Sequence, residues 1–241
     1  SYNFNNIIFD HLFLNYEKKQ NLFIVLCSIV LSLYIIEFGL YKIQNNFDKN
    51  QNKDKILQKK DLKFDNRSKL QIYSDLRKID PNYTIVVSPS SYLNEKKDFF
   101  PLSGISNSLT IFCNESGYYS IYKSDRYGFN NPNKVWNFND IEYLIIGDSF
   151  AQGACVNRPK DLSSIFRNLS NSTVLNLGYS GNGPLREYAS LREYMPLKKF
   201  KNVLWLYYSN DLNDLKFELK NDLLKKYIED INFKQDLHLK Q

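Results

Sequence analysis

The stretch that decides the fold is "IEYLIIGDSFAQGACV", residues 141–156. An apolar run at 143–147 ends at Gly147 and Asp148, and Ser149 follows directly. A short continuous apolar run that stops at turn-forming residues is typical of a strand buried on both faces. The stretch therefore predicts a buried strand that ends in a sharp turn, with Ser149 at the tip of that turn.

The chain repeats this pattern after the first strand. Residues 172–178 and 202–209 are apolar runs of strand length, and helical patterns occupy 159–169, 184–195 and 214–228. Apolar strands that alternate with helices of this length predict a parallel sheet covered by helices on both faces. We expect an α/β domain with three layers, α/β/α.

The segment before this domain has a different pattern. Residues 68–79 predict a short helix, 83–93 an extended segment, and 109–125 a hairpin around a Gly-centred turn. We expect an accessory α+β segment at 67–140 that leads into the α/β domain at 141–241.

An apolar stretch near the N-terminus predicts a membrane anchor. Residues 22–41 read "LFIVLCSIVLSLYIIEFGLY", about the ~20 residues that a helix needs to cross a bilayer, with Glu37 as the single charge. A buried helix of a soluble domain and the apolar part of a signal peptide are the alternatives. We expect a single-pass transmembrane helix between an N-terminal flank, 1–21, and a polar linker, 42–66.

The charge and the cysteines of the chain bear on the partners of the domain and on its cellular compartment. The formal charge of +6 is scattered along the chain rather than gathered in one tract, so we expect no nucleic-acid partner. Lysines flank both ends of the apolar stretch and do not fix its orientation, although we favour a periplasmic or extracytoplasmic domain. In that compartment Cys113 and Cys155 could pair, and buried free thiols are the alternative. The chain has no cluster of metal ligands at ligand spacing, and we expect neither a metal nor a cofactor.

Polar and glycine-rich residues follow each of the three predicted strands. The first strand ends in 147–149, the second in 178–183 and the third in 209–211. The carboxyl ends of parallel strands meet at one edge of a sheet, where such domains carry their chemistry. A hydroxyl, open backbone N–H groups and an asparagine amide at one edge are suited to acyl transfer, which needs a nucleophile and donors for an oxyanion.

The roles follow from the residue types. Ser149 would attack a carbonyl carbon. Its own N–H, the N–H of Gly181 and the amide of Asn210 would then stabilise the oxyanion, each such donor contributing roughly 3 kcal/mol in the transition state. Glycine at 181 allows close approach of the backbone to a substrate oxygen. We expect Asp214 to cap the third helix.

These motifs resemble the SGNH/GDSL hydrolases. "IIGDSFAQG" (145–153) is similar to the family's serine block, "NLGYSGNGP" (176–184) to its glycine block and "LYYSNDLND" (206–214) to its asparagine block. The resemblance implies a flavodoxin-like α/β/α fold.

The family roles are carried over by position. The resemblance implies Ser149 as the nucleophile, Gly181 and Asn210 as oxyanion donors, and Asp148 and Asp211 as turn-forming neighbours.

One block of the family pattern is missing from the printed sequence. The family takes its base from a late Asp-x-x-His block, whereas this chain has only His11 and His238, and Gln235 stands where the aspartate before His238 would be. We expect His238 to be a surface histidine and the protein to continue past Gln241. We also expect the printed 241 residues alone to be nearly inactive as a hydrolase.

Three functions remain open from the sequence. The first is a membrane-anchored SGNH-like serine esterase or O-acyltransferase that acts on acyl groups of a small molecule, lipid or glycan. The second is a catalytically inactive SGNH-like binding or scaffold domain. The third is a flavodoxin-like domain that binds a nucleotide or phosphate at the glycine-rich turn, 178–183.

Overall fold

The computed structural model describes residues 18, 20–42, 64–95 and 98–240. They fall into two compact units, Ser1–Leu62 and Lys63–Gln241. Most of the predicted flank, including His11, and most of the predicted linker lie outside the described residues.

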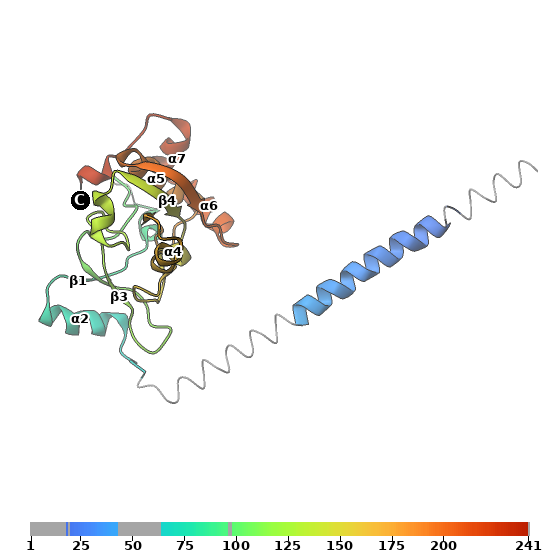
Figure 1. Cartoon of the computed structure of the whole chain (residues 1–241), viewed down its shortest axis with the longest axis horizontal. Coiled ribbons are helices and arrows are strands. Elements are labelled where there is room, and N and C mark those ends of the chain that lie inside the picture. Colours follow the sequence, from blue (N-terminus) through green and yellow to red (C-terminus); the bar gives the residue numbers. More distant parts are fainter. Residues whose placement is uncertain (1–17, 19, 43–63, 96–97, 241) are drawn as a thin grey trace, which may run out of the picture. The chain divides into compact units, whose positions relative to one another are not determined.

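The described residues of the first unit form an apolar helix, Gln20–Lys42, drawn in blue in Figure 1. It has 23 residues, and its most apolar stretch of 18 residues has a mean hydropathy of 2.4. At 1.5 Å per residue it is roughly 34 Å long, against about 30 Å for the hydrocarbon core of a bilayer. The hydroxyls of Ser28 and Ser32 donate to the carbonyls of Val25 and Ser28, at 2.8 Å and 2.7 Å, which satisfies these polar groups within the helix. The helix is therefore long and apolar enough to cross a membrane.

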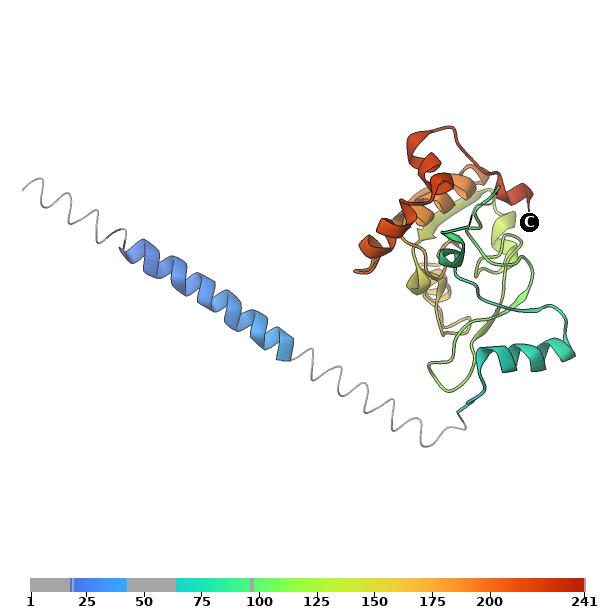
Figure 2. The same cartoon turned by 180° about the vertical axis from the view of Figure 1, so that it is seen from behind.

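The second unit has mixed α and β structure (Figures 1 and 2). Its first half contains α2 (Lys69–Ile79), β1 (Tyr83–Ile85), the 3₁₀ helix η1 (Pro89–Tyr92), β2 (Leu109–Ile111), β3 (Ile121–Lys123) and the 3₁₀ helix η2 (Asn133–Asn137).

The helix predicted at 68–79 is confirmed as α2, which begins with a capping box between Ser68 and Gln71. β1 pairs with β2 in parallel, and β2 pairs with β3 in antiparallel, so the hairpin at 109–125 is also confirmed. The extended segment at 83–93 is a strand only at β1 and then turns into η1.

The second half of the unit alternates strands with helices. It contains β4 (Asp140–Ile146), α3 (Ser149–Gln152), α4 (Leu162–Ser170), β5 (Val174–Asn176), α5 (Pro184–Tyr194), the 3₁₀ helix η3 (Met195–Leu197), β6 (Lys199–Trp205), α6 (Asp211–Glu218), α7 (Asp222–Glu229) and the 3₁₀ helix η4 (Leu237–Leu239). β4 lies between β5 and β6 and pairs with both in parallel. The predicted parallel arrangement of these strands is confirmed.

Alternate residues of β4 face two separate apolar clusters. Leu144 packs in the cluster that contains Ala189 of α5 and Leu224 of α7. Its neighbour Ile145 packs in the cluster that contains Ala151 of α3. Since neighbouring side chains of a strand point to opposite faces, helices lie on both faces of β4.

The third predicted helix is wrong in its extent. Residues 214–228 form two helices because the side chain of Asn221 accepts hydrogen bonds from the N–H groups of Leu223 (3.1 Å) and Leu224 (3.0 Å), which starts α7 afresh. The predicted cap is also wrong, since Asp214 lies in the first turn of α6 and Asn210 holds the N-cap position.

The two outer strands of this sheet differ in burial. All three residues of β5 are buried, whereas Val203 and Trp205 of β6 are 41% and 46% exposed. The sequence predicted that the strand at 202–209 is buried on both faces. This prediction is wrong for β6, because β6 is an edge strand and no described segment pairs with its outer edge.

A disulfide joins Cys113 and Cys155, with the two Cα atoms 4.9 Å apart. Of the two alternatives for these cysteines, the paired state is the one in the structure. The bond ties the end of β2 to the loop that follows α3.

Candidate active site

Ser149 lies at the end of β4, as the first residue of α3. The turn before it needs glycine: Gly147 has φ +154°, and a Cβ there would come within 2.8 Å of the Ala151 Cβ and 3.0 Å of the Leu206 carbonyl oxygen. The carboxylate of Asp148 accepts a hydrogen bond from the N–H of Phe150 at 2.8 Å and so caps α3. These contacts hold Ser149, which is half-buried, on a strand–turn–helix corner.

The glycine-rich turn after β5 is bonded directly to that corner. The Tyr179 N–H donates to the Gly147 carbonyl oxygen at 3.1 Å, and the Ser180 N–H donates to Gln152 Oε1 at 2.6 Å. Gly181 has φ +78°, a left-handed conformation that favours glycine. The second turn is thus fixed against the first by hydrogen bonds at two of its residues.

The turn after β6 lies at the same edge of the sheet. A backbone hydrogen bond to β4 and a contact between two aromatic rings hold it there. The Leu206 N–H donates to the Ile146 carbonyl oxygen at 2.9 Å, and the rings of Phe150 and Tyr208 lie 4.8 Å apart. The Asn210 amide nitrogen donates to Asp214 Oδ2 at 3.0 Å, so its direction is set.

The side chain of Asp211 stabilises this third turn by a hydrogen bond within the turn. It is fully buried, and its Oδ2 accepts a hydrogen bond from the Tyr208 N–H at 2.6 Å. The five residues predicted for the site, Ser149, Gly181, Asn210, Asp148 and Asp211, thus occupy three turns at the carboxyl edge of one parallel sheet.

A third carboxyl group lies near the two predicted aspartates. Glu187 of α5 is 1% exposed and accepts a hydrogen bond from the Trp205 indole N–H at 2.6 Å. Burial raises the pKa of Glu187 to about 8, and the negative charges of Asp211 and Asp148 add to the rise. Burial likewise raises the pKa of Asp148 and of Asp211, with smaller contributions from neighbouring carboxylates. The edge is therefore acidic, and Glu187 holds a proton at neutral pH.

The sequence offered no signal for this role of Glu187. A glutamate in the first turn of a helix has an ordinary explanation in the helix dipole. Only its packing against β6 separates it from a surface residue.

The start of α5 is occupied by a carboxylate of the chain itself. Glu218, which is buried, accepts hydrogen bonds from the N–H groups of Gly183 (2.8 Å) and Leu185 (2.9 Å). It also forms an ion pair with the buried guanidinium of Arg186. The backbone donors that could hold a phosphate at this helix start are therefore already engaged.

Two serines that sequence reasoning missed lie on the glycine-rich turn. A Cβ built on Gly181 would lie 2.0 Å from Ser88 Oγ and 3.4 Å from Ser90 Oγ. Both serines belong to η1 and its cap, in the segment that the sequence predicted only as extended.

The one described histidine is far from Ser149. His238 lies in η4, next to Leu237, whose N–H donates to Glu193 Oε2 at 2.9 Å. Glu193 is nine residues along α5 from Pro184, roughly 14 Å at 1.5 Å per residue, so His238 lies toward the opposite end of α5 from the glycine-rich turn. Within residues 18–240, as far as they are described, no side chain is hydrogen-bonded to the Ser149 hydroxyl.

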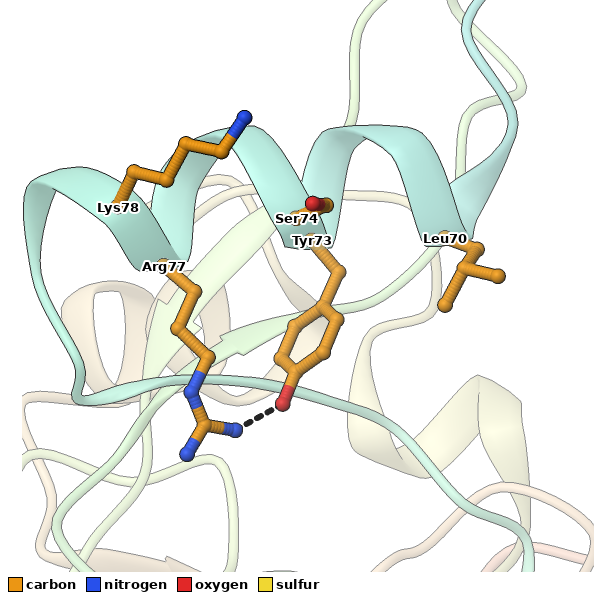
Figure 3. Close-up of a pocket in the computed structure, with 5 residues that line it drawn as sticks. All are labelled: Leu70, Tyr73, Ser74, Arg77 and Lys78. Atoms are coloured by element: carbon orange, nitrogen blue, oxygen red, sulfur yellow. Dashed lines mark hydrogen bonds between the residues drawn. The ribbon is translucent and has the colours of Figure 1, made fainter.

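The described residues hold no group of three or more His, Cys, Asp or Glu side chains that could bind a metal ion. A hollow of about 390 Å³ along α2 is lined by Leu70, Tyr73, Ser74, Arg77 and Lys78 (Figure 3). All five residues come from one helix, α2. The Arg77 guanidinium donates a hydrogen bond to the Tyr73 hydroxyl and is not directed at a nucleophilic side chain. The carboxyl edge of β4, β5 and β6 remains the best candidate.

Comparison of the chain with protein-family models, with curated proteins and with solved structures finds no match.

Proposed function

We propose that the protein is a membrane-anchored serine esterase or O-acyltransferase of the SGNH type, with Ser149 as its nucleophile. The observation that carries the proposal is the direct bonding of three turns at one sheet edge. The turn of Gly147 accepts from Tyr179 of the glycine-rich turn, and β4 accepts from Leu206 just before the asparagine turn. Three motifs that are separate in sequence thereby share one small region.

The chemistry follows from these groups. The Ser149 Oγ attacks the carbonyl carbon of an ester, an Oγ–C bond forms, and the bond between that carbon and the alcohol oxygen breaks. The N–H groups of Ser149 and Gly181 and the amide of Asn210 donate to the oxyanion. The hydrogen bond from Asn210 to Asp214 supports this role, because an amide held in one direction costs less reorganisation during the reaction.

A proton acceptor must take the Ser149 hydroxyl proton. His238 does not suit this role because it lies in η4, toward the end of α5 that is opposite the glycine-rich turn. As the resemblance implies, we propose that an Asp-x-x-His block supplies the acceptor and later returns the proton to the leaving alcohol.

The setting of the enzyme is also part of the proposal. The helix Gln20–Lys42 supports a single membrane span, and the disulfide between Cys113 and Cys155 supports a domain on the periplasmic or extracytoplasmic side, where disulfides persist. Helices on both faces of β4 support a three-layer, flavodoxin-like arrangement. The substrate would be an acylated small molecule, lipid or glycan.

The alternatives have less support. A phosphate or nucleotide at the glycine-rich turn would have to displace Glu218 from the start of α5 and would meet the acidic edge around Asp148. A binding or scaffold domain accounts for the distant His238, but it gives no reason for the fixed Asn210 amide.

Ester turnover tests the proposal. The natural protein, purified in detergent, should hydrolyse p-nitrophenyl acetate, and Ser149→Ala should abolish the reaction. Asn210→Ala should lower kcat by about 100-fold with little change in KM, because the amide acts in the transition state.

A control variant is Ser91→Ala, since Ser91 is exposed on η1 and its hydroxyl makes no hydrogen bond to the described residues. It should keep full activity. Turnover that survives Ser149→Ala would contradict the proposal.

A further inference from the structure

A pair of serine hydroxyls lies against the proposed oxyanion turn. Ser88 Oγ and Ser90 Oγ are 2.6 Å apart, and Ser88 Oγ occupies the space that a side chain at Gly181 would need. Glycine at 181 is thus required twice, by its φ of +78° and by the contact with Ser88. The two hydroxyls therefore lie directly against the Gly181 turn.

The pair has hydrogen-bonding capacity to spare. One hydroxyl proton is used between the two oxygens, and Ser88 Oγ also accepts the Ser90 N–H at 3.3 Å. The second hydroxyl proton has no acceptor among the described residues. Because Ser88 is half-buried and Ser90 is exposed, this donor can reach a bound molecule.

The segment that carries the pair is anchored at both ends. The Val86 N–H donates to the Ile111 carbonyl oxygen at 3.0 Å before the pair, and the Asn221 amide donates to the Leu93 carbonyl oxygen at 3.0 Å after it. Pro89, between the two serines, is buried. The hydroxyls are therefore preorganised, as a recognition site requires.

We propose that the Ser88–Ser90 hydroxyl pair is the subsite for the alcohol portion of the ester, where it donates a hydrogen bond to a hydroxyl group of that alcohol. The inference rests on the proposed function, because it takes the Gly181 turn as the place where the ester carbonyl binds. An apolar acyl chain would gain nothing from two hydroxyls, whereas a hydroxyl-bearing alcohol replaces the hydrogen bonds that it loses to water.

The charge of the edge limits which alcohol fits. Burial raises the pKa of Asp148 and of Asp211, and the negative charge of Asp214 adds to both rises. A negatively charged alcohol would be repelled there, so the expected alcohol is neutral and carries a free hydroxyl beside the ester.

The test measures binding rather than turnover, in the full-length protein with Ser149→Ala. Saturation-transfer NMR would compare the dissociation constants of glycerol monoacetate, which has free hydroxyls, and ethyl acetate, which has none. Glycerol monoacetate should bind about three- to tenfold more tightly, the effect of one hydrogen bond. Adding Ser88→Ala should abolish this preference, and adding Ser91→Ala should leave it unchanged.

A second variant distinguishes the loss of the Ser88 hydroxyl from a change in the structure of η1. Ser88→Cys keeps the size of the side chain but replaces the hydroxyl by a weak donor, so it should also lose the preference. A preference that survives both Ser88 variants, equal affinities for the two acetates, or no binding of either would overturn the inference. Failure of the proposed function has a different signature: with the preference for glycerol monoacetate intact, the protein with Ser149 in place would show no ester turnover.

Discussion

β5 and β6 both flank β4 in parallel, yet one edge of the sheet is closed and the other is open. The outer edge of β5 is closed by side chains. Asn131 donates to the Asn176 carbonyl oxygen at 2.8 Å and accepts from its N–H at 3.0 Å, and Arg167 donates to the Val174 carbonyl oxygen at 3.0 Å. The outer edge of β6 has no such cover from the described residues, and every side chain of β6 is exposed or half-buried.

The difference shows that a sheet edge can be completed without another strand. An asparagine side chain offers the same donor and acceptor as a peptide group, so Asn131 continues the ladder where β5 would otherwise leave its backbone unpaired. The proposed catalytic turns follow β4, β5 and β6. The nucleophile and glycine turns therefore rest on the closed side, and Asn210 follows the open strand.

The largest expected effect comes from opening the closed edge. Asn131→Ala should lower the free energy of unfolding by about 4 kcal/mol, because it leaves the buried backbone groups of Asn176 without partners. The matched change on the open side is Asn202→Ala. The Asn202 side chain is exposed and, among the residues that the structure describes, donates only to the Glu142 carbonyl oxygen, at 3.3 Å, so its loss should cost less than about 0.5 kcal/mol. Urea unfolding of both variants measures the contrast, and equal losses would refute it.

The disulfide on the closed side should have the next largest effect. It precedes α4, which packs on β5, and it closes a loop with a sequence separation of 42 residues. Replacing Cys113 and Cys155 together by serine should lower the free energy of unfolding by about 3 kcal/mol, because the unfolded chain gains conformational freedom. Cys27→Ser, in the apolar helix, is the control. Thermal unfolding that is the same in both variants would contradict the structural role of the bond.

A pair of valines compares the two strands side by side. Val174 of β5 is fully buried, and Val203 of β6 is 41% exposed. Val174→Ala should cost about 2 kcal/mol, from lost burial and the cavity left behind, and Val203→Ala less than about 1 kcal/mol. Chemical unfolding measures both losses, and a larger loss at Val203 would contradict an open edge at β6.

The smallest expected effect, taken over a single pH unit, concerns Glu187, which bonds to Trp205 of β6. Its pKa is raised to about 8 in the folded protein, so the unfolded chain releases this proton at lower pH than the folded one does. The free energy of unfolding should therefore fall as the pH rises from about 4.3, the pKa of a glutamate in the unfolded chain, toward 8. The fall should be at most about 1.4 kcal/mol per pH unit. Glu187→Gln should remove this part of the slope, as measured by unfolding free energies at pH 6 and pH 7. An unchanged slope would contradict the protonated state of Glu187.

Local patterns in the sequence predicted most of the second sheet. The apolar run before Gly147 and the helical patterns at 159–169 and 184–195 each depend on neighbouring residues, and all three are confirmed as β4, α4 and α5. The break at Asn221 was missed because Asn is read equally well as a surface residue of one long helix.

Contacts between distant residues could not be predicted in this way. Asn131 is 45 residues from Asn176, and Glu218 is 35 residues from Gly183. Nothing in the local sequence marks one asparagine as a strand edge or one glutamate as the cap of another helix. The same holds for Ser88, which meets the turn of Gly181 only because η1 lies across it.

Covalent labelling of Ser149 tests the central claim most directly. The natural protein, with its chain intact and solubilised in detergent, would be treated with a fluorophosphonate, and the modified peptide would be identified by mass spectrometry. An activated serine displaces fluoride and forms a stable phosphonate ester, so the account predicts that the label lies on Ser149 and is lost after heat denaturation of the protein. A native protein in which Ser149 stays unmodified, or in which other serines react equally, would contradict the proposed esterase or acyltransferase.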